Sequence, residues 1–145
     1  MVCYVYGAGG AAKASAVALG DLGCRLFIVN RTMERAIRFV KKLNDLGYEA
    51  SMMDRCGDSV DVVVNATPEP SFVHDECLKA KLVIELVYKP VETILIKKAR
   101  SRGIDVIDGV RILVRQALEA QRIWLGVDYP DEKVIGYLYA RKLIW

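Results

Sequence analysis

The sequence predicts an α/β fold, a doubly wound parallel sheet of six strands in the order 3-2-1-4-5-6, known as the Rossmann fold. Three observations support this. Short apolar segments alternate with amphipathic helical segments along the chain, a glycine-rich run directly follows the first apolar segment, and the 145 residues match the usual size of one domain. Because strands that alternate with helices form parallel sheets through right-handed crossovers, few other arrangements are possible.

Each expected element has its own sequence signal. The strands are expected at residues 2–6, 25–29, 48–53, 60–64, 82–87 and 104–107, and the fourth is the richest in β-branched residues. Helices are expected after the glycine run and at 35–46, 93–102, 109–125 and 131–144, and a short helical turn follows Pro70 up to Lys79. The 35–46 segment carries Ala36, Phe39, Val40 and Leu43 at helical spacing, and Gly47 ends it.

The glycine-rich run follows the first strand without a gap. Its residues, Gly7, Ala8, Gly9, Gly10, Ala11 and Ala12, match the pattern G-x-G-x-x-G/A. Gly7 would make the tight turn, Gly9 would let the backbone approach a diphosphate, and Ala12 would let the helix pack on the strand. The helix N-terminus favours anions. We therefore expect Gly7 to Ala11 to bind the diphosphate of a dinucleotide.

The end of the second strand indicates which dinucleotide. NAD-binding domains place an acidic residue about 20 residues after the glycines, and here that position is Asn30. A carboxylate would repel a 2′-phosphate, whereas Arg31 and Arg35 can grip one with planar guanidinium groups. Thr32 adds a hydroxyl and is expected to cap the next helix. The segment predicts NADP(H), and the alternative is that both arginines only form a solvated helix start.

The fourth strand ends at Asn65, Ala66 and Thr67, which the predicted strand order places beside the glycine loop. Their polar groups could touch the nicotinamide half of the cofactor. The alternative is that Asn65 and Thr67 only hold a loop.

Charge and hydrophobicity limit the partners and the location that the sequence predicts. The net charge is only +3 with no basic run, so no nucleic-acid partner is expected. No apolar run has the 18 residues that a membrane helix needs, and the N-terminal residues, which lack a cationic start, are not expected to form a signal peptide. A cytoplasmic protein is expected.

The cysteines and the single histidine predict no metal or redox site. Cys3, Cys24, Cys56 and Cys77 are widely spaced, and Cys3 and Cys24 are expected to be small buried apolar side chains rather than a disulfide. His74 is expected at the surface.

Five segments occur in order along almost the whole chain: 7–12 (GAGGAA), 30–35 (NRTxxR), 65–68 (NATP), 86–90 (LVYxP), and 109–126, which contains GxxILVxQA followed by WxG. Together they resemble the cofactor domain of shikimate dehydrogenases. The resemblance implies reversible NADPH-dependent reduction of 3-dehydroshikimate to shikimate in aromatic amino-acid biosynthesis. It assigns Asn30, Arg31, Thr32 and Arg35 to the 2′-phosphate, Leu86 and Gly109 to the nicotinamide, and Tyr88 and Gln116 to the substrate.

Some residues leave these assignments open. Tyr88 could simply pack under Pro90, and Gln116 could face water. Glu69 and Pro70 stand where the family usually has a glycine, Glu85 replaces the usual aspartate, and Lys13 replaces the usual arginine.

In this family the catalytic lysine and aspartate belong to an N-terminal domain that precedes the glycine loop. No catalytic residue is therefore expected within residues 1–145, and the chain alone is expected to be inactive without that domain, in cis or in trans. Alternatives are a free-standing NADP-binding or sensory module and a quinate/shikimate dehydrogenase. Residues 127–145 are expected to contain a C-terminal helix that is apolar on more than one side and that belongs to an interface, with a further domain or in a homo-oligomer. The alternative is that this helix docks on the sheet and buries its apolar residues there.

Overall fold

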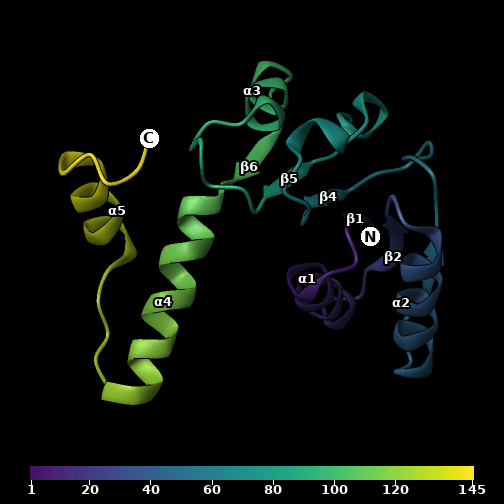
Figure 1. Cartoon of the computed structure of the whole chain (residues 1–145), viewed down its shortest axis with the longest axis horizontal. Helices are drawn as coiled ribbons and strands as arrows, with labels where there is room; N and C mark the ends of the chain where they lie inside the picture. Colours follow the sequence, from purple (N-terminus) through teal and green to yellow (C-terminus); the bar gives the residue numbers. More distant parts are fainter.

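A computed structural model describes all residues, 1–145, and contains a parallel sheet of six strands in the order β3-β2-β1-β4-β5-β6 (Figure 1). The predicted fold class and strand order are confirmed. The strands are β1 (Val2–Tyr6), β2 (Arg25–Val29), β3 (Ala50–Met52), β4 (Val62–Asn65), β5 (Leu82–Glu85) and β6 (Asp105–Ile107). The helices are α1 (Gly10–Asp21), α2 (Met33–Asp45), α3 (Ile94–Ser101), α4 (Gly109–Leu125) and α5 (Asp131–Ala140), with short 3₁₀ turns at Pro70–Phe72 and Asp75–Cys77.

The sheet separates two apolar cores, because successive side chains of a strand point to opposite faces. On one face, Cys3 and Val5 of β1 pack with Leu26 of β2 and with buried side chains of α1 and α2. On the other face, Tyr4 and Tyr6 pack with α3 and with the 3₁₀ turns. All of these strands are therefore buried on both sides, which explains their nearly continuous apolar sequence.

The third strand and the last helix fall furthest short of their predicted ranges. The third strand begins at Ala50, because Tyr48 leaves the sheet to pack over Gly20 of α1 and to donate to Asp21 at 2.6 Å. The last helix ends at Ala140 because Lys142 adopts a left-handed conformation with φ of 53°. The four residues that follow Arg141 form a turn and a short tail.

The expectation that the cysteines are unpaired is wrong. Disulfides join Cys3 to Cys24, with Cα atoms 5.8 Å apart, and Cys56 to Cys77, with Cα atoms 5.2 Å apart. The register of the parallel pair β1–β2 places Cys3 opposite Leu26, so that Cys24 lies within bridging distance. The second pair is separated by 21 residues and is brought together by the loop before β4 and the 3₁₀ turn at Cys77.

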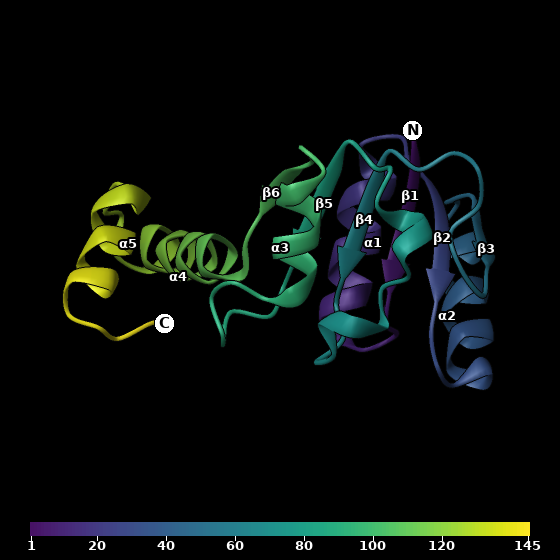
Figure 2. The same cartoon turned by 90° about the horizontal axis from the view of Figure 1, so that it is seen from above.

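Helices α4 and α5 project from the β6 edge of the sheet and pack on each other (Figures 1 and 2). Arg111 of α4 and Asp131 of α5 form an ion pair at 3.3 Å, and Arg115 reaches the same carboxylate at 2.9 Å. No residue of α5 is buried.

None of the helices has the length and apolar character to cross a membrane.

Candidate cofactor-binding site

The predicted cofactor residues gather around one pocket at the carboxyl ends of β1, β2 and β4. The pocket has a volume of about 370 Å³ and includes the aromatic ring of Phe72. Eight predicted residues line it: Gly7, Gly9, Asn30, Arg31, Thr32, Arg35, Ala66 and Thr67. This is the edge of an open α/β sheet at which ligands bind, next to the point where the strand order reverses.

The glycine loop has the geometry that its sequence predicts. Gly7 has φ of 118°, and a Cβ at this position would lie 3.0 Å from the carbonyl oxygen of Ala66. Only glycine fits there without strain. A Cβ on Gly9 or Gly10 would meet no protein atom within 4 Å. The backbone of the loop is therefore open on the side from which a diphosphate would approach.

Arg31 is held over the pocket by an aromatic residue that the sequence analysis missed. Its guanidinium carbon lies 4.8 Å from the centroid of the Phe72 ring, a distance typical of a cation–π contact. The two residues are 41 positions apart, and no local sequence signal links them. The contact keeps the guanidinium close to the place where an adenine and its ribose would lie.

Asn30 and Thr32 shape the turn between β2 and α2. The Asn30 side chain donates to the carbonyl oxygen of Thr32 at 3.0 Å. Thr32 occupies the N-cap position of α2, but its side chain accepts no hydrogen bond from the helix. The expectation that the Thr32 hydroxyl caps the helix is therefore wrong, and that hydroxyl remains available at the pocket.

Asn65 is fully buried and its side chain is engaged within the protein. It donates to Glu85 Oε1 at 2.9 Å and accepts from the Thr67 hydroxyl at 2.7 Å. Glu85 also accepts from the Val87 N–H at 3.0 Å and from the Thr93 hydroxyl at 2.9 Å. These bonds fix the loop after β4 against the loop after β5. Burial raises the pKa of the Glu85 carboxyl above its usual range, although the three bonds oppose the shift.

A second polar cluster lies behind the pocket, on the face of the sheet that carries Phe72. The Tyr6 hydroxyl lies 2.8 Å from His74 Nδ1 and 3.0 Å from Cys77 Sγ. Burial raises the pKa of Tyr6 to about 12. His74 is half-buried in this cluster, so its expected surface position is wrong. Tyr6 and His74 are 68 positions apart, and no local sequence signal predicts the contact.

The predicted nicotinamide contacts lie where β5 ends and α4 begins. A Cβ on Gly109 would lie 2.6 Å from the carbonyl oxygen of Val87 and 2.8 Å from that of Leu86. Glycine therefore allows the start of α4 to touch the end of β5. Leu86 and Gly109 are neighbours, but neither lines the 370 Å³ pocket.

The two predicted substrate residues lie apart from that pocket. Tyr88 is about half exposed and shares a hollow of about 240 Å³ with Leu143, Ile144 and Trp145. Trp145 closes this hollow, because its carbonyl oxygen accepts from the Val91 N–H at 2.8 Å. Gln116 is exposed on α4. The structure thus places Tyr88 against the C-terminal tail and leaves Gln116 free on a helix face.

A glycine loop at the switch point of a doubly wound sheet, with an arginine-lined pocket beside it, defines a dinucleotide-binding domain of the Rossmann class. The model of the family described as shikimate / quinate 5-dehydrogenase matches residues 2–96. The shikimate dehydrogenase (NADP(+)) of Saccharolobus islandicus strain L.S.2.15 is 58% identical over 99% of the chain, and that of Sulfolobus acidocaldarius is 51% identical over 99%. The chain belongs to the shikimate / quinate 5-dehydrogenase family.

Solved structures agree with this assignment. The shikimate dehydrogenase of Mycobacterium tuberculosis aligns with 96% of the chain at a TM-score of 0.83 and 25% identity, and the alignment covers 55% of that protein. A shikimate dehydrogenase solved in complex with NADP+ aligns with 90% of the chain at a TM-score of 0.73 and 30% identity, covering 51% of that protein. The chain spans about half the length of the curated relatives, 54% in both archaeal enzymes.

Proposed function

We propose that this chain is the NADP(H)-binding half of a shikimate dehydrogenase, which reversibly reduces 3-dehydroshikimate to shikimate with NADPH as the reductant. The observation that carries the proposal is the position of Arg31 and Arg35 on the pocket that also contains Gly7 and Gly9. A 2′-phosphate is the group that distinguishes NADP from NAD, and guanidinium groups bind it where a carboxylate would repel it. The relatives named for NADP support the same cofactor.

The residues present fit this cofactor. The open backbone at Gly9 and Gly10 would receive the diphosphate at the N-terminus of α1. Asn30, Arg31, Thr32 and Arg35 would surround the adenosine 2′-phosphate, with Ala66 and Thr67 on the opposite wall. Leu86 and Gly109 would support the nicotinamide. When bound, the cofactor supplies a hydride, and the chain contributes its position and orientation.

The other half of the reaction needs residues outside this pocket. Hydride transfer to a ketone requires a proton donor at the carbonyl oxygen and a site that fixes the substrate ring. We assign that donor to the half of the enzyme that residues 1–145 do not include, and we keep Tyr88 and Gln116 as this half's contacts to the substrate. The relatives support an enzyme over a sensory module, since they are named as dehydrogenases.

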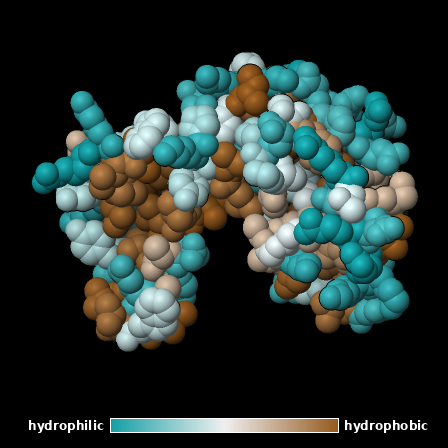
Figure 3. All heavy atoms as spheres, in the orientation of Figure 1, coloured by the Kyte–Doolittle hydropathy of each residue, from teal (hydrophilic) through white to brown (hydrophobic).

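The same proposal accounts for the exposed apolar surface of α4 and α5. Figure 3 shows apolar atoms gathered over these two helices, beside a hollow that separates them from the rest of the molecule. An apolar groove of about 430 Å³ runs along them, lined by Leu113, Val114, Ala117, Leu118, Gln121, Tyr129, Val134 and Leu138. We propose that the substrate domain covers this surface. Where that domain is lacking, association between copies of the chain would cover it instead.

Replacement of Arg31 tests the cofactor assignment. A hydrogen bond between charged groups contributes about 1.5–3 kcal/mol, which is about ten- to a hundredfold in affinity. Arg31→Ala should therefore weaken binding of NADP by this factor and leave binding of NAD nearly unchanged. Calorimetric titration of both cofactors against both proteins measures this, with Arg55→Ala as the control because Arg55 pairs with Glu76 outside the pocket. Equal losses for NADP and NAD would refute the assignment.

A further inference from the structure

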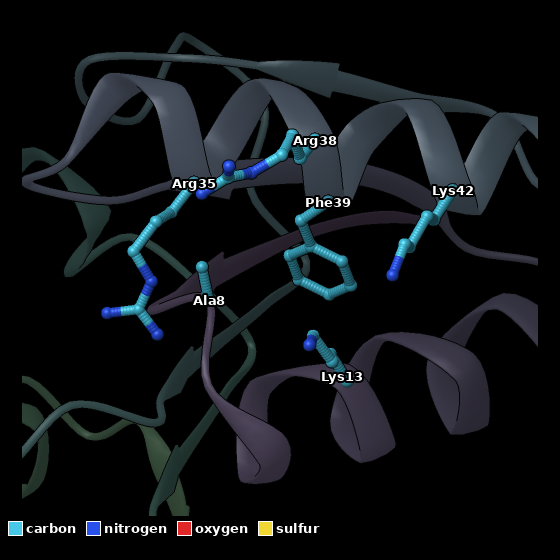
Figure 4. A pocket seen from close by; sticks show the side chains of 6 residues that line it. All are labelled: Ala8, Lys13, Arg35, Arg38, Phe39 and Lys42. Carbon is cyan, nitrogen blue, oxygen red and sulfur yellow. The ribbon is translucent and has the colours of Figure 1, made fainter.

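A second, smaller hollow adjoins the proposed adenosine pocket on the other side of Arg35. It has a volume of about 130 Å³ and lies between α1 and α2. Figure 4 shows it, with Lys13 on α1 opposite Phe39 and Lys42 of α2, and with the Arg38 side chain lying along α2 toward Arg35. We name it the basic groove. It holds about a third of the volume of the 370 Å³ pocket, so it suits a group of phosphate size better than a nucleoside.

The charges of the basic groove are of one sign. Four of its six lining residues are cationic, namely Lys13, Arg35, Arg38 and Lys42, and none is acidic. None of the four forms an ion pair within the protein. By contrast, Lys41 on the same helix pairs with Asp45 at 2.8 Å. The excess of positive charge on α2 is therefore confined to the face that borders the groove.

This arrangement costs free energy when the groove is empty. Arg35, Arg38 and Lys42 follow one another at spacings of three and four residues, so they lie on one helical face, where like charges repel. Lys13 adds a fourth positive charge from a different helix. An anion bound among them would attract each of the four cations, and these attractions would offset the repulsion between them. The groove is thus built for a negatively charged group.

The position of Arg35 indicates which group. Arg35 lines both the basic groove and the 370 Å³ pocket, and Ala8 lines the groove between the two glycines that line the pocket. A ribose in the pocket would have its 2′ substituent near this boundary, within reach of the groove. Among the groups of a nucleotide bound in this pocket, the one that would reach the basic groove is therefore a phosphate on the ribose 2′ position.

We propose that the basic groove is the outer half of the 2′-phosphate site, and that Lys13 and Arg38 bind this phosphate on the side opposite to Arg31. The inference rests on the proposed NADP function and deepens it. It makes Lys13 and Arg38 specificity-determining residues that lie outside the Asn30 to Arg35 segment. Their contribution is specific for NADP over NAD, because NAD carries no 2′-phosphate.

Titration of residues 1–145 with NADP and NAD tests the inference through binding alone. The variants are Lys13→Gln and Arg38→Gln, and the matched control is Lys41→Gln, which removes a cation of α2 that does not line the groove and pairs with Asp45. Each groove variant should weaken NADP binding about tenfold, as expected for a lost hydrogen bond between charged groups, and leave NAD binding unchanged. The control should change neither. Adenosine 2′,5′-bisphosphate and AMP should repeat the pattern, since they differ in the same phosphate.

The outcomes separate the two proposals. If Lys13→Gln and Arg38→Gln bind NADP as tightly as Lys41→Gln does, while Arg31→Ala binds it weakly, the groove is not part of the site and the proposed function stands. If the unmodified chain binds NADP no better than NAD, both proposals fail. Thermal unfolding without cofactor is the control for folding. The groove variants should melt no lower than the unmodified chain, because each removes a repulsive charge.

Discussion

The sheet and the α4–α5 pair differ sharply in how they bury their apolar residues. Four of the five residues of β1 are buried, and all four of β4 are, whereas α5 has none. Trp124, Tyr137 and Trp145 are each more than half exposed. The sheet and the helices packed on it thus contain the buried apolar core, whereas α4 and α5 leave large apolar side chains exposed. This difference supports the proposal that the substrate domain covers α4 and α5, because the sheet buries its apolar residues within residues 1–145 and these two helices leave many of theirs exposed.

A pair of leucine substitutions, one in the sheet and one in the tail that follows α5, should show the largest difference in the free energy of unfolding. Leu26 is fully buried in β2, and truncation of such a side chain costs about 2–5 kcal/mol. Leu143 is 57% exposed, so its truncation should change the free energy of unfolding by less than about 0.5 kcal/mol. Urea unfolding of Leu26→Ala and Leu143→Ala in residues 1–145 measures both. Comparable losses would show that the C-terminal tail belongs to the core.

Ionisation of Glu85 should have a smaller effect on the free energy of unfolding, and this effect depends on pH. Burial raises its pKa in the folded chain above the usual value of 4.5. The folded state therefore has its full stability where the carboxyl is protonated in both states, at pH below 4.5, and loses part of it as pH rises through the raised pKa. Glu85→Gln can still accept from Asn65 and Val87, and it cannot ionise.

The variant should gain stability relative to the unmodified protein as pH rises from 4 to 8. Thermal unfolding of both proteins across this range is the measurement, and the informative quantity is the difference between them at each pH. A difference that stays constant would mean that Glu85 does not change its ionisation in this range.

Local sequence signals were sufficient to predict the order of the strands and helices and the topology of the sheet. The glycine run and the alternation of strands and helices determined the strand order, because right-handed crossovers leave few alternatives. Arg31 and Arg35 could be placed beside the glycine loop because they follow β2 closely, and the structure puts both on the pocket that Gly7 and Gly9 line. The contacts that were missed join distant residues. Phe72 under Arg31, His74 beside Tyr6, and the cysteine pairs all depend on how loops pack, which no period or spacing encodes.

The most direct test of the account compares residues 1–145 alone with the same residues fused behind the N-terminal half of the Saccharolobus islandicus enzyme. Two quantities are measured on each protein, the affinity for NADP and the rate of shikimate-dependent NADP reduction. We predict similar NADP affinity for both and turnover only for the fusion, since α4 and α5 then contact the domain that supplies the proton donor. Turnover by residues 1–145 alone would contradict the account, as would a failure of those residues to bind NADP.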